Sequence, residues 1–308
     1  MSEQYRYPEY LLFNGEIVPF AEAKVHVWTP AFKYGSQVFE GLRGYWNEEQ
    51  QQLYIFRVDA HTRRLRRSMK IMRMEVTKDV EQLNEKTIEL LKANGFREGC
   101  HIRQVVFVNH VGPGMAKLGP IGTLASTYFR GRFSEKEGLD CCVSTWRRIS
   151  DNSIPPRVKC AANYQNSRLA LVQAKVDGYD APILLTDDGK VSETYGSCLF
   201  IVRDGVPITT PVTSSILESV TRATVIQLFK EVHDVEVQVR DIDMTELYVA
   251  DEAFMCGSGA EITPILSIDR YQLGDGKPGP LTQKIQMTYF QVVQGEVPLH
   301  PEWRTPVY

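Results

Sequence analysis

The pattern of hydrophobic and polar positions alternates between the period of two typical of strands and the three-to-four spacing typical of helices. In the first half, strands are expected at residues 52–57 and 101–109, and helices at 59–71 and 81–94. In the second half, the pattern predicts helices at 166–176 and 221–232, and strands at 141–146, 235–239 and 252–257. Asp59 is the N-cap that the sequence favours for the helix at 59–71.

Turn signals separate these elements. Asn14-Gly15 between two apolar runs predicts a type I′ hairpin, and Asp188-Gly189 and Asp204-Gly205 predict two more hairpins. Gly95 follows the expected helix at 81–94, where a C′ glycine belongs. Antiparallel hairpins with interspersed helices in both halves argue for an α+β, mixed α-β fold rather than a regular alternation of strand and helix.

The composition of the chain mainly excludes classes of function. The chain has 308 residues, of which 43% are hydrophobic, so it can bury a large core, and its net charge of -3 gives no electrostatic footprint for nucleic acid. The six cysteines form no C-x-x-C pair and have no histidines at ligand spacing, so no metal is expected. No apolar run is long enough to span a membrane and the N-terminus does not resemble a signal peptide, so a cytoplasmic location is expected.

The composition turns polar around residues 130–138, which marks a candidate domain boundary. The sequence therefore predicts a small N-terminal domain at 1–130, an interdomain loop at 131–139 and a large C-terminal domain at 140–308.

Two residues stand out for their chemistry. Lys159 lies in "IPPRVKCAANY" among small apolar residues, and a lysine amine in such surroundings can form a Schiff base with a carbonyl compound. Glu193, in "GKVSETYGS", follows a hairpin turn and precedes small residues, so its carboxylate can pair with a ligand cation. An ordinary surface lysine and an exposed strand-end glutamate are the alternative interpretations that local sequence leaves open.

Other stretches suit anions. Ser219, Val220 and Thr221 lead into a helix, whose first N–H groups favour phosphate, although a plain helix cap has the same pattern. Gly257 and Gly259 flank Ser258, which indicates a backbone nest or a tight turn.

The expected strand at 101–109 carries a pair of cationic side chains. His101 and Arg103 are two residues apart, so both point to one face of the strand. Arg64, in contrast, sits in a basic cluster on the helix at 59–71, where solvation is the default interpretation.

Six motifs in order resemble the fold-type IV pyridoxal-phosphate enzymes, especially the branched-chain amino acid aminotransferases. They are "YGSQVFEGLRGY", "FRVDAHTRRLRRSMKIMRM", "HIRQVVFVN", "VKCAANYQNSRLALVQAKVDGYDAPILLTDDGKVSETYGSCLFIV", "TSSILESVTRATVI" and "EAFMCGSGAEITPI". The resemblance implies a small N-terminal α/β domain and a larger C-terminal pseudo-barrel domain. It also implies a pyridoxal 5'-phosphate (PLP) cofactor, an amino donor and a 2-oxo acid acceptor as substrates, and a homodimer or larger assembly.

The same resemblance implies residue roles. Lys159 forms the Schiff base and then shuttles a proton, Glu193 pairs with the pyridinium nitrogen, and Tyr164 binds the ring hydroxyl oxygen. The residues implied to hold the phosphate are Arg64, Ser219, Val220, Thr221 and Ser258. The residues implied to bind substrate are Tyr34, Phe39, Arg43, His101, Arg103, Arg130, Gly257, Gly259 and Ala260.

The sequence departs from the branched-chain pattern at several positions. His101 stands where a tyrosine is usual, Ala161 and Ala162 replace common glycines, and Arg130 lies where an aromatic pocket residue is expected. These differences keep open a fold-type IV transaminase of altered scope, acting on (R)-primary amines or D-amino acids. An enzyme of the aminodeoxychorismate-lyase type and a non-catalytic binding or structural protein are the remaining alternatives.

Overall fold

The computed structural model describes residues 7–129 and 136–308. The described part of the chain divides into two compact units. Unit one comprises Met1–Gly131, Val158–Ala162 and Gln291–Tyr308, and unit two comprises Arg132–Arg157 and Asn163–Phe290. The segment that carries Lys159 therefore groups with the N-terminal part of the chain, whereas the sequence places it in the C-terminal domain. The expected interdomain loop at 131–139 falls largely outside the described residues and stays a prediction.

Unit one is built on a seven-stranded sheet in which every pairing is antiparallel. The strand order is β16-β4-β3-β5-β6-β1-β2. Its strands are β1 (Tyr10–Phe13), β2 (Glu16–Pro19), β3 (Gln37–Asn47), β4 (Gln52–Phe56), β5 (Cys100–Val108), β6 (Ile121–Phe129) and β16 (Arg304–Pro306). The turn between β1 and β2 has positive φ at both Asn14 (49°) and Gly15 (83°), which confirms the type I′ hairpin predicted from the sequence.

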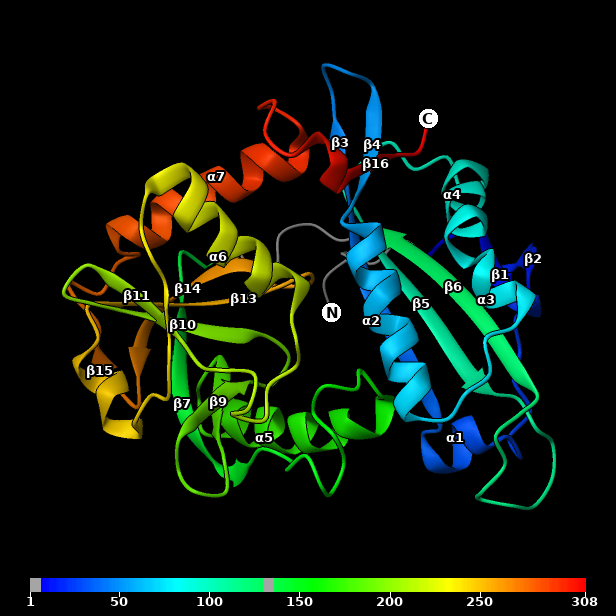
Figure 1. Cartoon of the computed structure of the whole chain (residues 1–308), viewed down its shortest axis with the longest axis horizontal. Coiled ribbons are helices and arrows are strands. Elements are labelled where there is room, and N and C mark those ends of the chain that lie inside the picture. The colour runs from blue at the N-terminus through cyan, green and yellow to red at the C-terminus, as the bar shows by residue number, and fades with distance from the viewer. Residues whose placement is uncertain (1–6, 130–135) are drawn as a thin grey trace. The chain divides into compact units, whose positions relative to one another are not determined.

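Helices α2 and α4 cover one face of this sheet (Figure 1). Apolar side chains of both helices share one core with the β3 and β5 residues that point to that face. The helices of this unit are α1 (Pro30–Tyr34), α2 (Val58–Ile71), α3 (Lys78–Glu81) and α4 (Leu83–Ala93), with 3-10 turns at Phe20–Glu22 and Pro301–Trp303.

The start of α2 differs from the expectation. The N-cap is Arg57 in the left-handed conformation (φ 51°), and Asp59 lies in the first turn instead. A tertiary contact explains the difference, because the Arg57 guanidinium stacks 4.3 Å from the Trp303 ring and the Arg57 backbone N–H donates to the Trp303 carbonyl. The expected helix at 81–94 is likewise shorter and begins at Leu83, while Gly95 adopts the positive φ of a C′ residue.

Unit two contains a nine-stranded mixed sheet that curls into a half-barrel. Strand β7 pairs in parallel with both β8 and β14, and the hairpins on either side are antiparallel. Its strands are β7 (Leu139–Arg147), β8 (Ala181–Leu185), β9 (Val191–Thr194), β10 (Cys198–Arg203), β11 (Val206–Thr209), β12 (Gln238–Val239), β13 (Glu252–Gly257), β14 (Glu261–Ile268) and β15 (Tyr271–Gln272).

The helices of unit two begin where the sequence places its candidate cofactor residues. Tyr164 is the first residue of α5 (Tyr164–Val176), and Val220 is the first residue of α6 (Val220–His233). Helix α7 (Pro280–Gln294) begins in the same unit, and a 3-10 turn lies at Met244–Val249. The 3-10 turn at Ala161–Asn163 spans the boundary between the two units in the chain. The predicted strand at 235–239 is reduced to β12, whose two side chains are both exposed.

The expected mixed α-β fold is confirmed, with an antiparallel sheet in unit one and a curled half-barrel sheet in unit two. Among the described residues, no helix has the length and apolar character needed to cross a bilayer.

Candidate active site

Lys159 is held against β3 by backbone contacts. Cys160 forms an antiparallel bridge with Val38, and the Phe39 N–H donates to the Lys159 carbonyl at 2.9 Å. The Lys159 N–H donates in turn to Ser68 Oγ of α2 at 3.3 Å. The bridge places Cys160 in the core beneath α2 and α4. Because strand side chains alternate, Lys159 points to the opposite face of the sheet, the one on which Phe39 lies.

Cationic side chains gather on that face. The Lys159 Nζ lies 4.8 Å from the centroid of the Phe39 ring, and the Arg103 guanidinium carbon lies 4.1 Å from the same centroid. Both cations therefore contact one aromatic ring. The β3–β5 register pairs Gly41 with Arg103 and Arg43 with His101, so all of these positions share the face. The structure thus brings together five of the residues that the sequence predicts for catalysis and substrate binding.

The absence of a side chain at Gly41 makes room for the His101 ring. A Cβ built on Gly41 would meet His101 Cε1 at 3.2 Å and Nε2 at 3.3 Å. The ring of Tyr128 flanks His101 with a centroid distance of 5.1 Å. The position of His101 is therefore fixed by a glycine on one neighbouring strand and an aromatic ring on the other.

Arg64 is not a solvated member of the basic cluster. Its side chain is 9% exposed, and it forms a two-point contact with Glu40, from Nε to Oε1 at 2.8 Å and from Nη2 to Oε2 at 2.6 Å. His61 Nδ1 lies 2.7 Å from Glu40 Oε2. This fork fixes the orientation of the guanidinium, and Nη1 is the end that we expect to face a phosphate.

The ionisation of this cluster is set by its contacts. Burial by itself raises the pKa of Glu40, but the charge and the hydrogen bonds of Arg64, with His61, outweigh it and bring the pKa down to about 2. Burial also lowers the pKa of His61, so the histidine is neutral at neutral pH. Glu40 is therefore an ionised carboxylate whose function here is to fix Arg64. No sequence pattern indicated Glu40 or His61, because both occupy ordinary strand and helix positions.

In unit two, Glu193 on β9 is buried at 3% exposure. Its Oε1 lies 2.7 Å from Arg148 Nη2, and its Oε2 accepts from the Leu217 N–H at 3.2 Å. The thiol of Cys198 also points to Oε2, with the sulfur 3.9 Å away. Glu193 is thus not the exposed strand-end glutamate of the alternative interpretation. Arg148, which sequence reasoning missed, supplies its counter-charge.

Helix α6 begins three residues after Leu217, at Val220. Ser219 is its N-cap, and the Ser219 hydroxyl accepts from the Arg222 N–H at 3.2 Å. Thr221 in the first turn is 2% exposed. Arg222 anchors this end of the helix by donating to the Thr210 carbonyl at 2.8 Å. The first N–H groups of α6, at Val220 and Thr221, are the donors that a phosphate would use.

The remaining candidates of this unit are Gly257, the last residue of β13, and Ser258, Gly259 and Ala260, which form the turn to β14. A Cβ on Gly257 would meet Ser197 Oγ at 3.1 Å, so this turn lies next to the loop between β9 and β10. Contacts therefore connect Gly257, Glu193 and the start of α6 within unit two.

Of the predicted residues that the structure describes, Tyr34 lies apart from these groups. Tyr34 ends α1, outside β3, and is 43% exposed. Arg130 lies outside the described residues. Within the described ranges, no cluster of His, Cys, Asp or Glu side chains is arranged to hold a metal ion.

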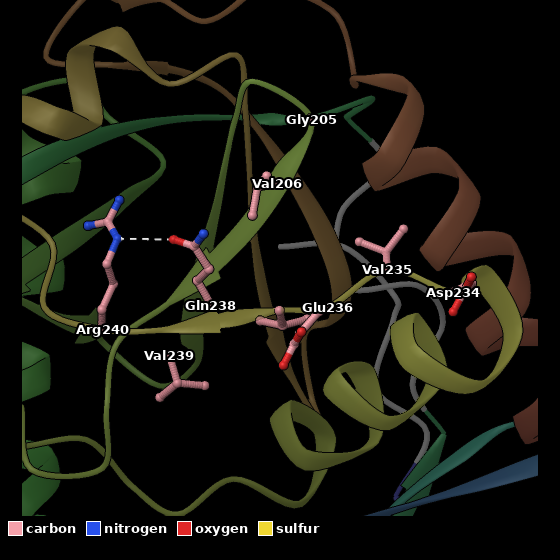
Figure 2. Close-up of a pocket in the computed structure, with 9 residues that line it drawn as sticks. Gly205, Val206, Asp234, Val235, Glu236, Gln238, Val239 and Arg240 are labelled. Atoms are coloured by element: carbon pink, nitrogen blue, oxygen red, sulfur yellow. Dashed lines mark hydrogen bonds between the residues drawn. The ribbon is translucent and has the colours of Figure 1, made fainter.

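One open pocket in unit two, of about 690 Å³, does not coincide with any of these candidates (Figure 2). It lies beside the exposed strand β12 and is lined by Gly205, Val206, Asp234, Val235, Glu236, Val237, Gln238, Val239 and Arg240. Its Arg240 and Gln238 side chains contact each other, with Nε donating to Oε1 at 3.4 Å. No group there matches the chemistry indicated by the sequence, so we place the candidate site on the residues above.

Comparison with known proteins relates the chain to one family. Residues 37–268 match the family described as amino-transferase class IV. A probable branched-chain-amino-acid aminotransferase of Aquifex aeolicus is 40% identical over 302 residues, covering 97% of each chain.

Solved structures agree. The branched-chain amino acid aminotransferase of Thermobaculum terrenum in its PLP form is 43% identical with a TM-score of 0.91, covering 98% of this chain and 99% of that one. The T.th. branched-chain amino acid aminotransferase in complex with N-(5'-phosphopyridoxyl)-L-glutamate is 35% identical with a TM-score of 0.93, covering 98% and 99%.

The Glu40 cluster generates a stability prediction. We expect Glu40→Gln to destabilise the protein by about 3–5 kcal/mol at neutral pH, because it leaves a buried guanidinium without its counter-charge. The folded pKa of Glu40, about 2, lies below its ordinary value of 4.5, so the stabilisation is complete above pH 4.5 and is lost as the pH falls toward 2. The measurement is urea unfolding of both proteins between neutral and acidic pH.

Glu85→Gln, at an exposed position of α4, is the matched control and should change stability by less than about 0.5 kcal/mol. Equal stabilities of the wild type and Glu40→Gln at neutral pH would contradict this account of the cluster.

Proposed function

Because this chain belongs to the class IV aminotransferase family, we propose that it is a PLP-dependent transaminase that moves an amino group between a branched-chain or related aliphatic L-amino acid and 2-oxoglutarate. The observation that supports this most directly is the placement of Lys159 on the same sheet face as His101 and Arg103. An amine able to hold a carbonyl cofactor there lies beside groups that attract carboxylates.

The donor set fits PLP. The amine of Lys159 suits the aldehyde, the carboxylate of Glu193 suits a protonated ring nitrogen, and the hydroxyl of Tyr164 suits the ring oxygen. The phosphate would be held by Arg64, the first N–H groups of α6 at Val220 and Thr221, and the hydroxyls of Ser219, Thr221 and Ser258. When bound, PLP withdraws electrons from the α-carbon of the substrate.

Protein side chains would bind the cofactor and the substrate and would transfer the proton. The amine of Lys159 would hold the aldehyde of the cofactor and, when free, would take the proton from the substrate Cα and return it. Glu193, as an ionised carboxylate, would keep the ring nitrogen protonated. Arg103 and His101 bind the substrate carboxylates, and Phe39 orients both Arg103 and Lys159 through its ring. Arg43 and the turn at 257–260 are the other proposed substrate contacts.

The names of the relatives support the choice of substrates. The proteins from Aquifex aeolicus and Thermobaculum terrenum are named as branched-chain aminotransferases, and the T.th. enzyme was solved with a phosphopyridoxyl derivative of L-glutamate. A cytoplasmic location is also part of the proposal, because all six cysteines are free, which is typical of a reducing compartment.

A homodimer or larger assembly is the expected form. Unit one exposes apolar side chains on two segments, residues 20–34 and 111–118, which Lys33 connects by donating to the Gly112 carbonyl at 3.0 Å. These side chains are Phe20, Val25, Val27, Trp28, Phe32, Tyr34, Val111, Met115 and Leu118. A monomer seldom leaves so many large apolar side chains in water, so we propose that a second copy covers them.

The substrate assignment is tested by half-reactions. L-leucine and L-glutamate should each bleach the yellow absorption of the bound cofactor, whereas D-alanine and (R)-1-phenylethylamine should not. The measurement is the visible spectrum after mixing the holoenzyme with each amine. Bleaching by the amine or the D-amino acid alone would instead favour the transaminase of altered scope.

The role of His101 is tested through Gly41. Gly41→Ala should displace the His101 ring and raise the KM for the amino acid several-fold, about 1 kcal/mol of binding, while leaving PLP affinity unchanged. Gly99→Ala, whose added Cβ meets no atom closer than 3.8 Å, is the control and should leave both quantities as in the wild type. An unchanged KM in Gly41→Ala would remove His101 from the substrate site.

The assembly is tested by size-exclusion chromatography with light-scattering detection of the molar mass. We expect the mass of two or more copies, and a lower mass for Phe32→Asp, which places a charge in the apolar area. Lys24→Asp, at an exposed polar position of the same segment, serves as the control. A wild type that elutes with the mass of one chain rules out the proposed dimer.

A further inference from the structure

Arg148 is a buried arginine of unit two to which the proposed function assigns no role. It follows β7 directly and is 7% exposed. Its Nη2 lies 2.7 Å from Glu193 Oε1. A buried arginine is rare unless it is paired, so this contact accounts for why the side chain is in the interior.

The guanidinium of Arg148 makes three further contacts through Nε and Nη1. Its Nε donates to the Ser215 carbonyl at 3.4 Å, and its Nη1 lies 3.4 Å from Ser167 Oγ and 3.5 Å from Asn166 Oδ1. The backbone N–H of Arg148 donates to the Leu185 carbonyl of β8 at 2.8 Å. The charge therefore cannot move away from Glu193 without breaking contacts to several elements.

These anchors lie beside other proposed cofactor contacts. Asn166 and Ser167 belong to the first turn of α5, which Tyr164 begins, and Ser215 lies in the loop that leads to the N-cap of α6. Arg148 thus joins the carboxylate proposed for the ring nitrogen to the helix that carries the hydroxyl proposed for the ring oxygen.

From this geometry we propose that Arg148 is a positioning residue, which keeps Glu193 ionised and oriented for the ring nitrogen of PLP. The proposal rests on the proposed function. A carboxyl buried without a counter-charge takes up a proton, and a protonated carboxyl cannot hold a pyridinium. Arg148 prevents this, and its anchored, planar guanidinium fixes the orientation of the carboxylate through Oε1.

The charged and titratable groups that face Glu193 determine how the ionisation of its carboxyl depends on pH. Arg148 approaches from the end of β7 and the Cys198 thiol from β10, while the loop at Leu217 offers its backbone N–H. Removing Arg148 takes away the positive charge that contacts the carboxyl from β7, which favours the protonated form near neutral pH. Raising the pH should ionise the Glu193 carboxyl of this variant again.

The test compares apoproteins carrying Arg148→Met, Arg148→Lys, Glu193→Gln and the double change Arg148→Met with Glu193→Gln. PLP binding is measured by fluorescence titration between pH 6 and pH 9. Arg148→Met should weaken PLP binding by about ten- to a hundredfold at neutral pH, the range found when the hydrogen-bond partner of a metal-binding residue is removed. The deficit should shrink as the pH rises, and the lysine variant should lie between Arg148→Met and the wild type. Arg147→Met, at the exposed neighbouring position, is the matched control and should bind as the wild type does.

A double-mutant cycle shows whether Arg148 acts through Glu193. Adding Arg148→Met to Glu193→Gln should weaken PLP binding little further. The proposal is overturned if the double variant loses PLP affinity by the product of the two single losses. It is also overturned if Arg148→Met binds PLP as tightly as the wild type while Glu193→Gln binds it weakly.

The unfolding midpoints of the apoproteins give a second cycle that needs no cofactor. The double variant should be more stable than Arg148→Met, because it removes both members of the buried pair. If Arg148→Met does not fold, the same comparison is made with Arg148→Lys, and independent effects of the two changes overturn the proposal. A wild type that binds no PLP would instead refute the proposed function, while this second cycle would still report on the pair.

Discussion

The antiparallel bridge between Cys160 and Val38 is the contact on which the arrangement of unit one depends. Strand side chains alternate, so this one register decides that Cys160 enters the core under α2 while Lys159 faces the other side with Phe39 and Arg103. A slip of one residue would bury the amine beneath the helices and expose the thiol. The small apolar residues around Lys159 in the sequence are explained by this need to pack one side of the segment tightly.

A buried ion pair in each unit holds a group that the proposed function needs. In unit one Glu40 fixes Arg64, and in unit two Arg148 fixes Glu193. Each pair joins one residue proposed to contact the cofactor to one that does not. Such pairs add little net stability, because desolvation offsets their attraction, but breaking one of them is costly. The two ion pairs therefore matter because they fix the positions of the groups proposed to bind a charged ligand.

Much of the fold could be predicted from the sequence, because period, turn residues and caps are local signals. The Asn14-Gly15 turn, the end of α5 at Val176 and the start of α6 within one residue of the prediction are examples. A tertiary contact accounts for one wrong prediction: the contact with Trp303 makes Arg57, not Asp59, the N-cap of α2. The bridge to β3 groups Lys159 with the N-terminal unit, which no local signal indicates. The motifs predicted which residues would contact the cofactor, but Glu40 and Arg148 had no local signal, since their partners are distant in the chain.

The central claim is that the amine of Lys159 is the point at which the cofactor attaches. Borohydride reduction of the holoenzyme followed by peptide mapping tests it directly, because reduction makes the bond between the amine and the cofactor permanent. The account predicts that the phosphopyridoxyl mass appears on one tryptic peptide, that of Lys159, and that Lys159→Ala carries none. Labelling of another lysine in the wild type, or equal labelling of Lys159→Ala, would contradict it.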